Sequence, residues 1–538
     1  MSRLAQVLLA VAALIGLVVG WRAFWFLCDD AFIEFRYVAN VHKGLGFVWN
    51  APPFSPVEGY TSFLWVALLE GVWRLTGAEP PESAPWLSLG LSAGTVLLVV
   101  AAAVRLPLAA SWEPYRPWVA AGVLVSTLTN RTFLTWTSSG LETSLWTFVF
   151  ALWAFAAVYL RAPDVVLVGL AALAALVRPD GLLLVATSAA FVAARAWRDR
   201  KPAQLVAWLP IAAVVAHLLW RHHTYGWWLP NTYYAKHVGP WPLMGVAYVT
   251  SFVVEFAYWP QVVLLGLASW AAVRARAVPD VGDPVVLGLG TIALHWAYYT
   301  FDVGGDHFEY RVYQHLVPVL ALASPVLAGR AGWSVRRASL AFVAAWLLGL
   351  VIPWTHYAAT YNWPETHTSI KDRKGSFRLP MVWRVPLPFA PYAYAWDGLQ
   401  LALNSHFVCI RWHGHRTYLE YQKDRWHMVH NGALPDLKGD IGVLPHTSIG
   451  WPAWKFQDWA MIDEHGLSDV AVAHSPPVHT SQFNRLMAHD HSAPKGYSAC
   501  YRPNLKLTKQ GVLFTPRATP LTAEEVHACE AKFGPARR

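Results

Sequence analysis

The sequence predicts a polytopic α-helical membrane protein with a smaller α/β domain at its C-terminal end. The chain has 538 residues, of which 55% are hydrophobic and only 14% are charged, and its mean hydropathy is +0.31. A soluble protein carries about a quarter charged residues, so this composition is typical of a chain built from membrane spans. Many of its 31 tryptophans stand at the ends of apolar runs, as in the aromatic belt of a membrane protein.

Eleven apolar runs are long enough, or nearly long enough, to cross a bilayer. The first run is longer than the hydrophobic segment of a signal peptide and lacks a clean cleavage site, so we expect it to be retained as a span. The expected spans cover residues 4–25, 84–104, 117–131, 142–160, 164–177, 181–197, 203–221, 246–273, 284–301, 313–329 and 336–356.

The orientation depends on the run at residues 62–76. Counted as a span, this run places the basic groups at 195–201 and 330–337 outside the cell. If it is an interfacial helix, with Glu70 and Arg74 towards the headgroups, every basic cluster falls inside. The positive-inside rule selects the second arrangement, with about eleven spans, an inside N-terminus and an extracytoplasmic C-terminal domain in the plasma (inner) membrane. The net charge of +9 then comes from the inner loops, so no nucleic-acid partner is expected.

These assignments divide the chain into two domains. Residues 1–356 form the transmembrane domain, whose first outer loop, residues 26–82, carries juxtamembrane helices. Residues 357–538 form the extracytoplasmic α/β domain, in which the apolar runs stop. We expect strands at 441–445 and 469–474 in this domain, with a helix over 454–467 between them.

The four cysteines lack the spacing of a metal site. Cys500 and Cys529 lie on the predicted outer side and can form a disulfide, although Cys409 can compete for either of them.

An adjacent pair of carboxylates, Asp29 and Asp30, follows the first span. Burying an aspartate in hydrocarbon costs about 2.5–3.5 kcal/mol on insertion scales, so the pair belongs in a polar cavity at the membrane surface. A short helix is expected at about residues 31–42, with Asp30 as its cap and Gly44 at its end. One carboxylate can act as general base on an acceptor hydroxyl while the other orients it or holds a cation. The structural alternative is a helix cap stabilised by the helix dipole.

The other polar motifs also fall on the predicted outer side. Arg178, Lys236 and Arg311 are the candidates for binding a phosphate, because arginine matches phosphate geometry and lysine supplies a point charge. The alternative for the two arginines is an ion pair within the bundle, with Asp180 and Asp306 respectively. The candidate substrate-binding residues are Glu58, Tyr60, Arg178, Asn231, Lys236, Asp306 and Arg311, whereas Glu142 is expected to cap a helix.

Taken in order, the motifs resemble one known family. "DDAFIEFRYVANVHKGLGFVWN", "VEGYTSFLW", "SGLET", "RPDG", "LPNTYYAK" and "GGDHFEYR" are similar to those of the AftB-like (terminal arabinofuranosyltransferase-like) membrane glycosyltransferases of the GT-C superfamily. The similarity extends to "MIDEHGLSDVAVA" and "GYSACYRPN" near the C-terminus. It implies that Asp29 and Asp30 are the acidic motif, that one of them is the base, and that Glu58 and Tyr60 line the pocket. The chain departs from the family where it reads "NAPPFSP" instead of "NPGE".

The resemblance implies an inverting glycosyltransferase at the outer face of the plasma membrane. Its donor would be a polyprenyl-phosphate sugar, with arabinofuranose as one candidate sugar, and its acceptor a cell-envelope glycan. If a divalent cation takes part, Asp29 and Asp30 would hold it. The alternatives are a transporter or flippase of lipid-linked sugars, which needs polar residues at mid-span, and a non-catalytic envelope or motility accessory protein. A polymer ligase that uses pyrophosphate-linked glycans would share the fold.

Overall fold

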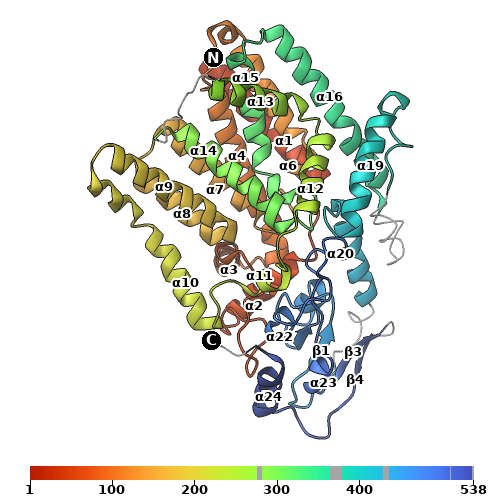
Figure 1. Ribbon diagram of the computed structural model, residues 1–538. Coiled ribbons are helices and arrows are strands. Elements are labelled where there is room, and N and C mark those ends of the chain that lie inside the picture. Colours follow the sequence, from red (N-terminus) through yellow and green to blue (C-terminus); the bar gives the residue numbers. More distant parts are fainter. Residues whose placement is uncertain (275–281, 364–378, 428–434, 509–510, 536–538) are drawn as a thin grey trace.

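The computed structural model describes residues 1–538 except 275–281, 364–378, 428–434, 509–510 and 536–538. Helices dominate the chain, and the N-terminus lies at one end of the helical bundle (Figure 1). The strands and the short helices after residue 440 lie at the other end, below the helices α2 (Ala31–His42), α3 (Phe63–Thr76) and α11 (Asn231–Lys236), whereas α19 (Ala390–Ser405) lies beside the bundle (Figure 1).

Each expected span coincides with one helix or a pair of helices. The helices are α1 (Arg3–Ala23), α4 (Pro80–Ala103), α5 (Arg116–Leu128), α7 (Thr143–Phe155) with its π-helical extension Ala156–Leu160, α8 (Asp164–Val177), α9 (Leu182–Arg198), α10 (Ile211–Tyr225) after the 3-10 turn Pro202–Trp208, α12 (Pro242–Glu255), α13 (Trp259–Arg274), α14 (Pro284–Ala297) with the extension Tyr298–Val303, α15 (Leu316–Arg330) and α16 (Val335–Thr360). Within the described residues, five helices are long and apolar enough to cross a membrane, or up to seven if each bent pair is one span. The chain is therefore a multi-pass membrane protein, and the count of eleven crossings stays a prediction.

The run expected to form one continuous span over residues 246–273 is broken. It forms α12 and α13, whose axes meet at 113°. Pro260 is the second residue of α13, and it has no backbone N–H with which to continue the hydrogen-bond ladder of the preceding helix. The expectation of an uninterrupted span was wrong at this point.

Two short helices follow α1. The helix α2 (Ala31–His42) has the predicted bounds, and Gly44 follows it at φ +79°. The helix α3 (Phe63–Thr76) has 14 residues and is too short to span a bilayer. Its Glu70 does not face headgroups as expected, because the side chain is buried against α2 and pairs with His42 at 3.3 Å and with Arg74.

The C-terminal segment contains two small sheets and several helices. β1 (Val443–His446) pairs in parallel with β2 (Ala460–Asp463), and β3 (Leu505–Thr508) pairs antiparallel with β4 (Gly511–Phe514). The helices are α19 (Ala390–Ser405), α20 (Trp412–His427), α21 (Trp451–Lys455), α22 (Val470–Ala473), α23 (Tyr497–Cys500) and α24 (Ala523–Phe533). Cys500 and Cys529 form a disulfide between α23 and α24, and Cys409 is a buried free thiol.

Of the expected strand–helix–strand order in this segment, the first strand is confirmed as β1, but the helix and the second strand were wrong. Residues 460–463 form a strand in which every residue is buried. Apolar and polar residues therefore do not alternate along it as in a half-buried strand, and the pattern was interpreted as a helix. Residues 470–473 are a helix instead of a strand, because the Asp469 side chain accepts a hydrogen bond from Val472 N and caps it.

The C-terminal segment is anchored on α2. The guanidinium of Arg36 is 1% exposed and donates hydrogen bonds to the carbonyl oxygens of Ala453 at 2.8 Å and Trp459 at 2.7 Å. It also donates to Trp49 O, in the first outer loop, at 2.8 Å. A single buried arginine thus joins the helix next to the acidic pair to the C-terminal segment.

Candidate active site

The backbone before the acidic pair is held by the "SSGLE" motif. Phe26 N donates to Ser138 Oγ at 3.2 Å, and Cys28 N donates to Ser139 O at 2.9 Å. Ser138 and Ser139 lie between α6 (Arg131–Thr135) and α7. Two motifs that are 112 residues apart in the sequence therefore meet at this point and fix where Asp29 and Asp30 stand.

The two aspartates have different surroundings. Asp29 is 6% exposed, and its Oδ1 accepts a hydrogen bond from Trp451 N at 2.9 Å. The backbone of Gly450 packs directly on Asp29, where any Cβ would overlap it. Asp29 therefore ties the end of α1 to the start of α21, which is a positioning task.

Asp30 precedes α2 but does not cap it, because its side chain makes no capping hydrogen bond. Within the described residues, its carboxylate has no hydrogen-bond or ion-pair partner. Its negative charge acts on Lys236, at the end of α11 (Asn231–Lys236), and on His307. Asp30 therefore interacts electrostatically with two other titratable groups.

Lys236 lies among several charges and pairs with none of them. Burial lowers the pKa of its amine, while the carboxylates of Asp30, Asp306 and Glu142 favour the charged form and Arg311 opposes it. No hydrogen bond or ion pair reaches its Nζ from the described parts of the chain. We call these five residues, Asp30, Glu142, Lys236, Asp306 and Arg311, the Asp30 cluster.

The loop of residues 304–311 supplies two members of the cluster. Gly304 and Gly305 have φ +87° and +100°, and a Cβ on them would lie 2.8 Å from Trp241 and 2.7 Å from Tyr248. Glycine is therefore required where the loop turns. His307 donates from Nδ1 to Phe407 O at 2.8 Å, and burial lowers the pKa of its imidazole although Asp30 acts in the opposite direction.

Arg311 is held on one side only. Its Nε donates to Asp306 at 3.0 Å, its Nη1 is 4.0 Å from Glu142, and its guanidinium carbon lies 4.3 Å from the centre of the Phe308 ring. The sequence analysis left open whether Arg311 binds a phosphate or pairs with Asp306, and the structure contains the ion pair with Asp306. Because only Nε has a hydrogen bond within the described residues, the remaining N–H groups can bind an oxyanion.

Arg178 is fully engaged by the protein. Its Nη1 donates to Glu142 at 2.7 Å, its Nε to Asp180 at 2.9 Å and its Nη2 to Tyr299 Oη at 2.8 Å. Tyr299 Oη in turn donates to Asp180 at 2.9 Å. The structure thus contains the ion pair considered as the alternative, and Arg178 orients Glu142 towards Arg311.

Glu34 joins the site although the sequence analysis did not select it. It lies one helical turn after Asp30 on α2, and its charge interacts with those of Glu142, Arg311 and Asp30. Its spacing of four residues from Asp30 was the available signal, because residues i and i+4 share a helix face.

Glu58, Tyr60 and Asn231 lie in a different network. Glu58 forms a two-point ion pair with Arg221 of α10 at 2.6 and 3.1 Å, and Tyr60 Oη is 3.2 Å from Tyr225 Oη. Asn231 Nδ2 donates to Gly466 O at 2.7 Å. These bonds hold the first outer loop between α10 and the C-terminal segment, and a substrate-binding role for the three residues stays a prediction.

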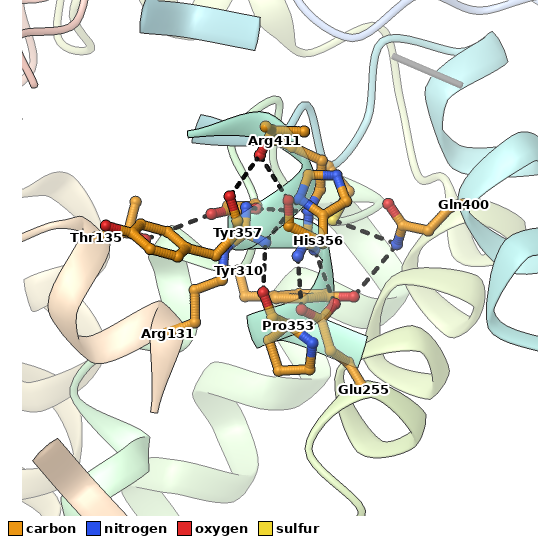
Figure 2. Close-up of polar contacts among 12 residues, drawn as sticks. Arg131, Thr135, Glu255, Tyr310, Pro353, His356, Tyr357, Gln400 and Arg411 are labelled. Atoms are coloured by element: carbon orange, nitrogen blue, oxygen red, sulfur yellow. Dashed lines mark hydrogen bonds and ion pairs between the residues drawn. The ribbon is translucent and has the colours of Figure 1, made fainter. Parts of the chain in front are cut away.

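A second charged network lies deeper and supports the 304–311 loop (Figure 2). Glu309, 1% exposed, pairs with Arg131 of α6 at 3.2 Å and with Arg411 at 2.7 Å. Arg411 also pairs with Glu255, at the end of α12, at 2.6 Å. Two arginines and two glutamates neutralise each other here, as buried charges must, and they fix the loop that carries Asp306 and Arg311.

Two large cavities lie away from the Asp30 cluster. One, of about 730 Å³, separates the first outer loop at Trp49 and Phe54 from Asp469 and Tyr497 of the C-terminal segment. The other, of about 760 Å³, lies between α5, α13, α15 and α16. Among the described residues, no group of three or more His, Cys, Asp or Glu side chains is arranged to hold a metal ion, so a cation at Asp29 and Asp30 stays a prediction.

The helices are arranged similarly to those in the solved structure of ArnT from Cupriavidus metallidurans bound to undecaprenyl phosphate, with a TM-score of 0.50, 14% sequence identity and 85% of each chain covered. No protein-family model and no curated protein matches the sequence. At this identity the similarity shows the fold, and membership of the GT-C superfamily and of its AftB-like group stays a prediction.

Proposed function

We propose that this protein is a glycosyltransferase that transfers a sugar from a polyprenyl-phosphate carrier to a cell-envelope glycan at the outer face of the plasma membrane. One observation carries the proposal: within the described residues neither Asp30 nor Lys236 has a hydrogen-bond or ion-pair partner, and the charges of Asp30 and Arg311 both act on the amine of Lys236. A base for a hydroxyl and cations for a phosphate are the two groups that the reaction needs. The fold shared with ArnT, which binds undecaprenyl phosphate, supports a polyprenyl-phosphate donor.

In the proposed reaction, Asp30 accepts the proton of an acceptor hydroxyl as its oxygen attacks the anomeric carbon. The bond between that carbon and the phosphate oxygen breaks, and its electron pair goes to the departing lipid phosphate. Lys236 and Arg311 stabilise the charge that develops there. A single displacement of this kind inverts the anomeric configuration. Arabinofuranose is the sugar that the resemblance to the AftB-like enzymes favours.

The outer location is supported by two features of the chain. The disulfide Cys500–Cys529 suits an oxidising compartment outside the cytosol. The basic residues at 195–201 and 330–337 lie at the opposite end of the spans in the proposed orientation, as the positive-inside rule requires.

The test is turnover by the purified full-length protein with a panel of polyprenyl-phosphate sugars, including arabinofuranose, and envelope glycan fragments. The variant Asp30→Asn keeps the size of the side chain but removes the base, so we expect its turnover number to fall about 100-fold to 10,000-fold. Asp29→Asn is the matched control, because it changes a neighbour whose carboxylate is bound to Trp451 N, and we expect a smaller loss.

Three results would contradict the proposal in whole or in part. If the wild-type protein transfers none of the sugars, the donor class is wrong. If Asp30→Asn keeps the wild-type rate while Asp29→Asn loses it, the roles of the two acids are exchanged. Full activity in both variants would favour the non-catalytic accessory protein.

A further inference from the structure

The helix α19 and the turn before it carry a row of large apolar side chains that the described chain leaves exposed. Trp383 is 84% exposed, Leu387 85%, Tyr394 71% and Leu401 54%. The last three follow each other at intervals of seven residues, so they lie on one face of the segment. A soluble domain rarely exposes so large an apolar surface unless that surface is a contact site.

The same stretch contains few charges. Between residues 383 and 405 the charged side chains are Arg384 and Asp397 alone. The carboxylate of Asp397 accepts hydrogen bonds from Met381 N at 2.8 Å and from Val382 N at 2.9 Å, so its oxygens are used within the segment. Arg384 stands near the start, and the long side chain of an arginine can reach lipid headgroups. A helix face in water normally carries charged residues, and this one does not.

The opposite face of α19 packs on α12 of the membrane bundle. Trp396 Nε1 donates to Glu255 at 3.0 Å, and Gln400 Nε2 donates to Ser251 Oγ at 2.8 Å. Residue numbers therefore rise along α19 as they fall along α12, so the two helices are antiparallel. The helix α19 lies beside the bundle (Figure 1).

The ends of two spans give the depth of this contact. Helices α1 and α16 are both long and apolar enough to cross a membrane. Tyr357 Oη of α16 donates to the carbonyl oxygen of Ala23, the last residue of α1, at 3.0 Å, so this level marks one end of the bundle. Further into the bundle, a Cβ on Gly349 of α16 would lie 2.6 Å from the carbonyl oxygen of Phe256, which follows α12. At about 1.5 Å per helical residue, Gly349 lies about 12 Å below Tyr357.

The helix α19 starts near this depth and rises from it. Tyr392 Oη donates to the carbonyl oxygen of Val254, next to the end of α12, and Trp259 Nε1 donates to Tyr392 Oη at 3.1 Å. Just after the other end of α19, His406 Nδ1 donates to the carbonyl oxygen of Arg485, in the C-terminal segment, at 2.7 Å. The helix thus runs from among the spans to the C-terminal segment.

We propose that residues 379–405 dip into the membrane leaflet on the Asp30 side of the bundle, with Leu387 and Tyr394 against the acyl chains and Leu401 near the headgroups. Helices that lie in the interface bury their apolar face by about 5–10 Å, which agrees with the depth of α19. Lipid is the partner because the exposed face adjoins the surface of α13, where Trp259, the partner of Tyr392, is 42% exposed.

This insertion changes the domain boundary. The part of the chain outside the membrane, expected to begin at residue 357, then begins after α19. The inference goes beyond the proposed function and does not depend on it, because the depth is measured from the ends of α1 and α16 and not from the Asp30 cluster.

Nitroxide labels on the full-length protein in phosphatidylethanolamine and phosphatidylglycerol liposomes test the insertion. Labels on Leu387→Cys, Tyr394→Cys and Leu401→Cys are compared for their collisions with oxygen, which concentrates in lipid, and with a nickel chelate, which stays in water. Leu347→Cys on α16, 52% exposed, is the lipid reference, and Phe483→Cys, 77% exposed, is the water reference.

We expect the ratio of oxygen to nickel collisions at Leu387 and Tyr394 to be several-fold higher than at Phe483 and close to that at Leu347, with a lower value at Leu401. Ratios equal to that at Phe483 would place the face in water and overturn the proposal. Exclusion of both reagents would also overturn it, because protein would then cover the face. Neither outcome bears on the Asp30 cluster, so the proposed function would stand.

A charge on the same face gives a readout that needs no label. Tyr394→Glu places a carboxylate in the lipid, which is unfavourable, so we expect its melting temperature in liposomes to fall. Phe483→Glu is the matched control, because its side chain is exposed in the C-terminal segment, and should keep the wild-type value. An unchanged melting temperature in Tyr394→Glu would overturn the insertion.

Discussion

Adjacent residues of the same type perform different tasks in this site. Asp29 is bound to Trp451 N, whereas Asp30 has no hydrogen-bond partner within the described residues. The difference follows from position, because consecutive residues at a helix start point in different directions: Asp29 is bound to the start of α21, whereas the charge of Asp30 acts on Lys236. A carboxylate already occupied by a backbone N–H is a weaker base, so the base is expected at Asp30.

At the same scale, Arg311 and Arg178 should respond differently to substitution. Arg311→Ala removes a cation proposed to bind the leaving phosphate, and we expect the turnover number to fall about 100-fold to 1,000-fold with a small change in the melting temperature. Steady-state kinetics and thermal unfolding in detergent measure the two effects. Wild-type turnover in Arg311→Ala would show that the phosphate is bound elsewhere.

Arg178→Ala is the matched variant. In the native protein, all three guanidinium nitrogens of Arg178 bond to buried partners. The substitution therefore removes the hydrogen-bonded cation beside Glu142 and Asp180. Breaking a buried ion pair costs about 3–5 kcal/mol, and we therefore expect a clear fall in the melting temperature. If the two variants were equally stable, the distinction between a structural and a substrate-binding arginine would be wrong.

At the scale of elements, the 304–311 loop depends on the network in Figure 2. Phe308 forms a β-bridge with Ile410, and Glu309 N donates to Ile410 O at 3.1 Å. The next residue after Ile410 is Arg411, which pairs with Glu309. The segment before α20 therefore holds the loop by backbone and side chain together, and the position of Arg311 follows from it.

Glu309→Gln tests this support. The change leaves Arg131 and Arg411 with one carboxylate instead of two, so we expect the protein to lose about 3–5 kcal/mol of stability and to lose activity as Arg311 shifts. Thermal unfolding and turnover at low temperature measure both. Glu113→Gln, which removes an exposed ion pair with Arg116, is the control and should change neither. An unchanged melting temperature in Glu309→Gln would exclude the supporting role.

At the scale of the whole molecule, the proposed orientation places the C-terminal segment outside. Trp197, in the last turn of α9, is 88% exposed, and Phe483, in the C-terminal segment, is 77% exposed. With a membrane-impermeant maleimide on intact spheroplasts, we expect Phe483→Cys to be labelled and Trp197→Cys to be labelled only after permeabilisation. The native chain is the control, because its free cysteines, Cys28 and Cys409, are buried. The reverse pattern would invert the topology and move the Asp30 cluster to the inner face.

The sequence by itself predicted a helical membrane protein, which the fold confirms, and the location of the proposed chemistry, which stays a prediction. Apolar runs, a short helix at residues 31–42 and an acidic pair before it are local patterns, and local patterns can be recognised along the chain. The basic residues Lys236 and Arg311 were found for the same reason, since few cations stand between spans on that side. The break at Pro260 and the helix capped by Asp469 have local causes that the apolar pattern did not show, whereas the full burial of strand 460–463 was decided by the tertiary structure.

Only the tertiary structure decided which of these residues interact. It engaged Asp29 and Arg178 within the protein, left Asp30 and Lys236 without a hydrogen-bond partner among the described residues, and brought the charge of Glu34 close to those of Asp30 and Arg311. The contact that separates the two aspartates joins residues 422 positions apart. No local pattern encodes such a contact, because it exists only once α2 and the C-terminal segment have packed together.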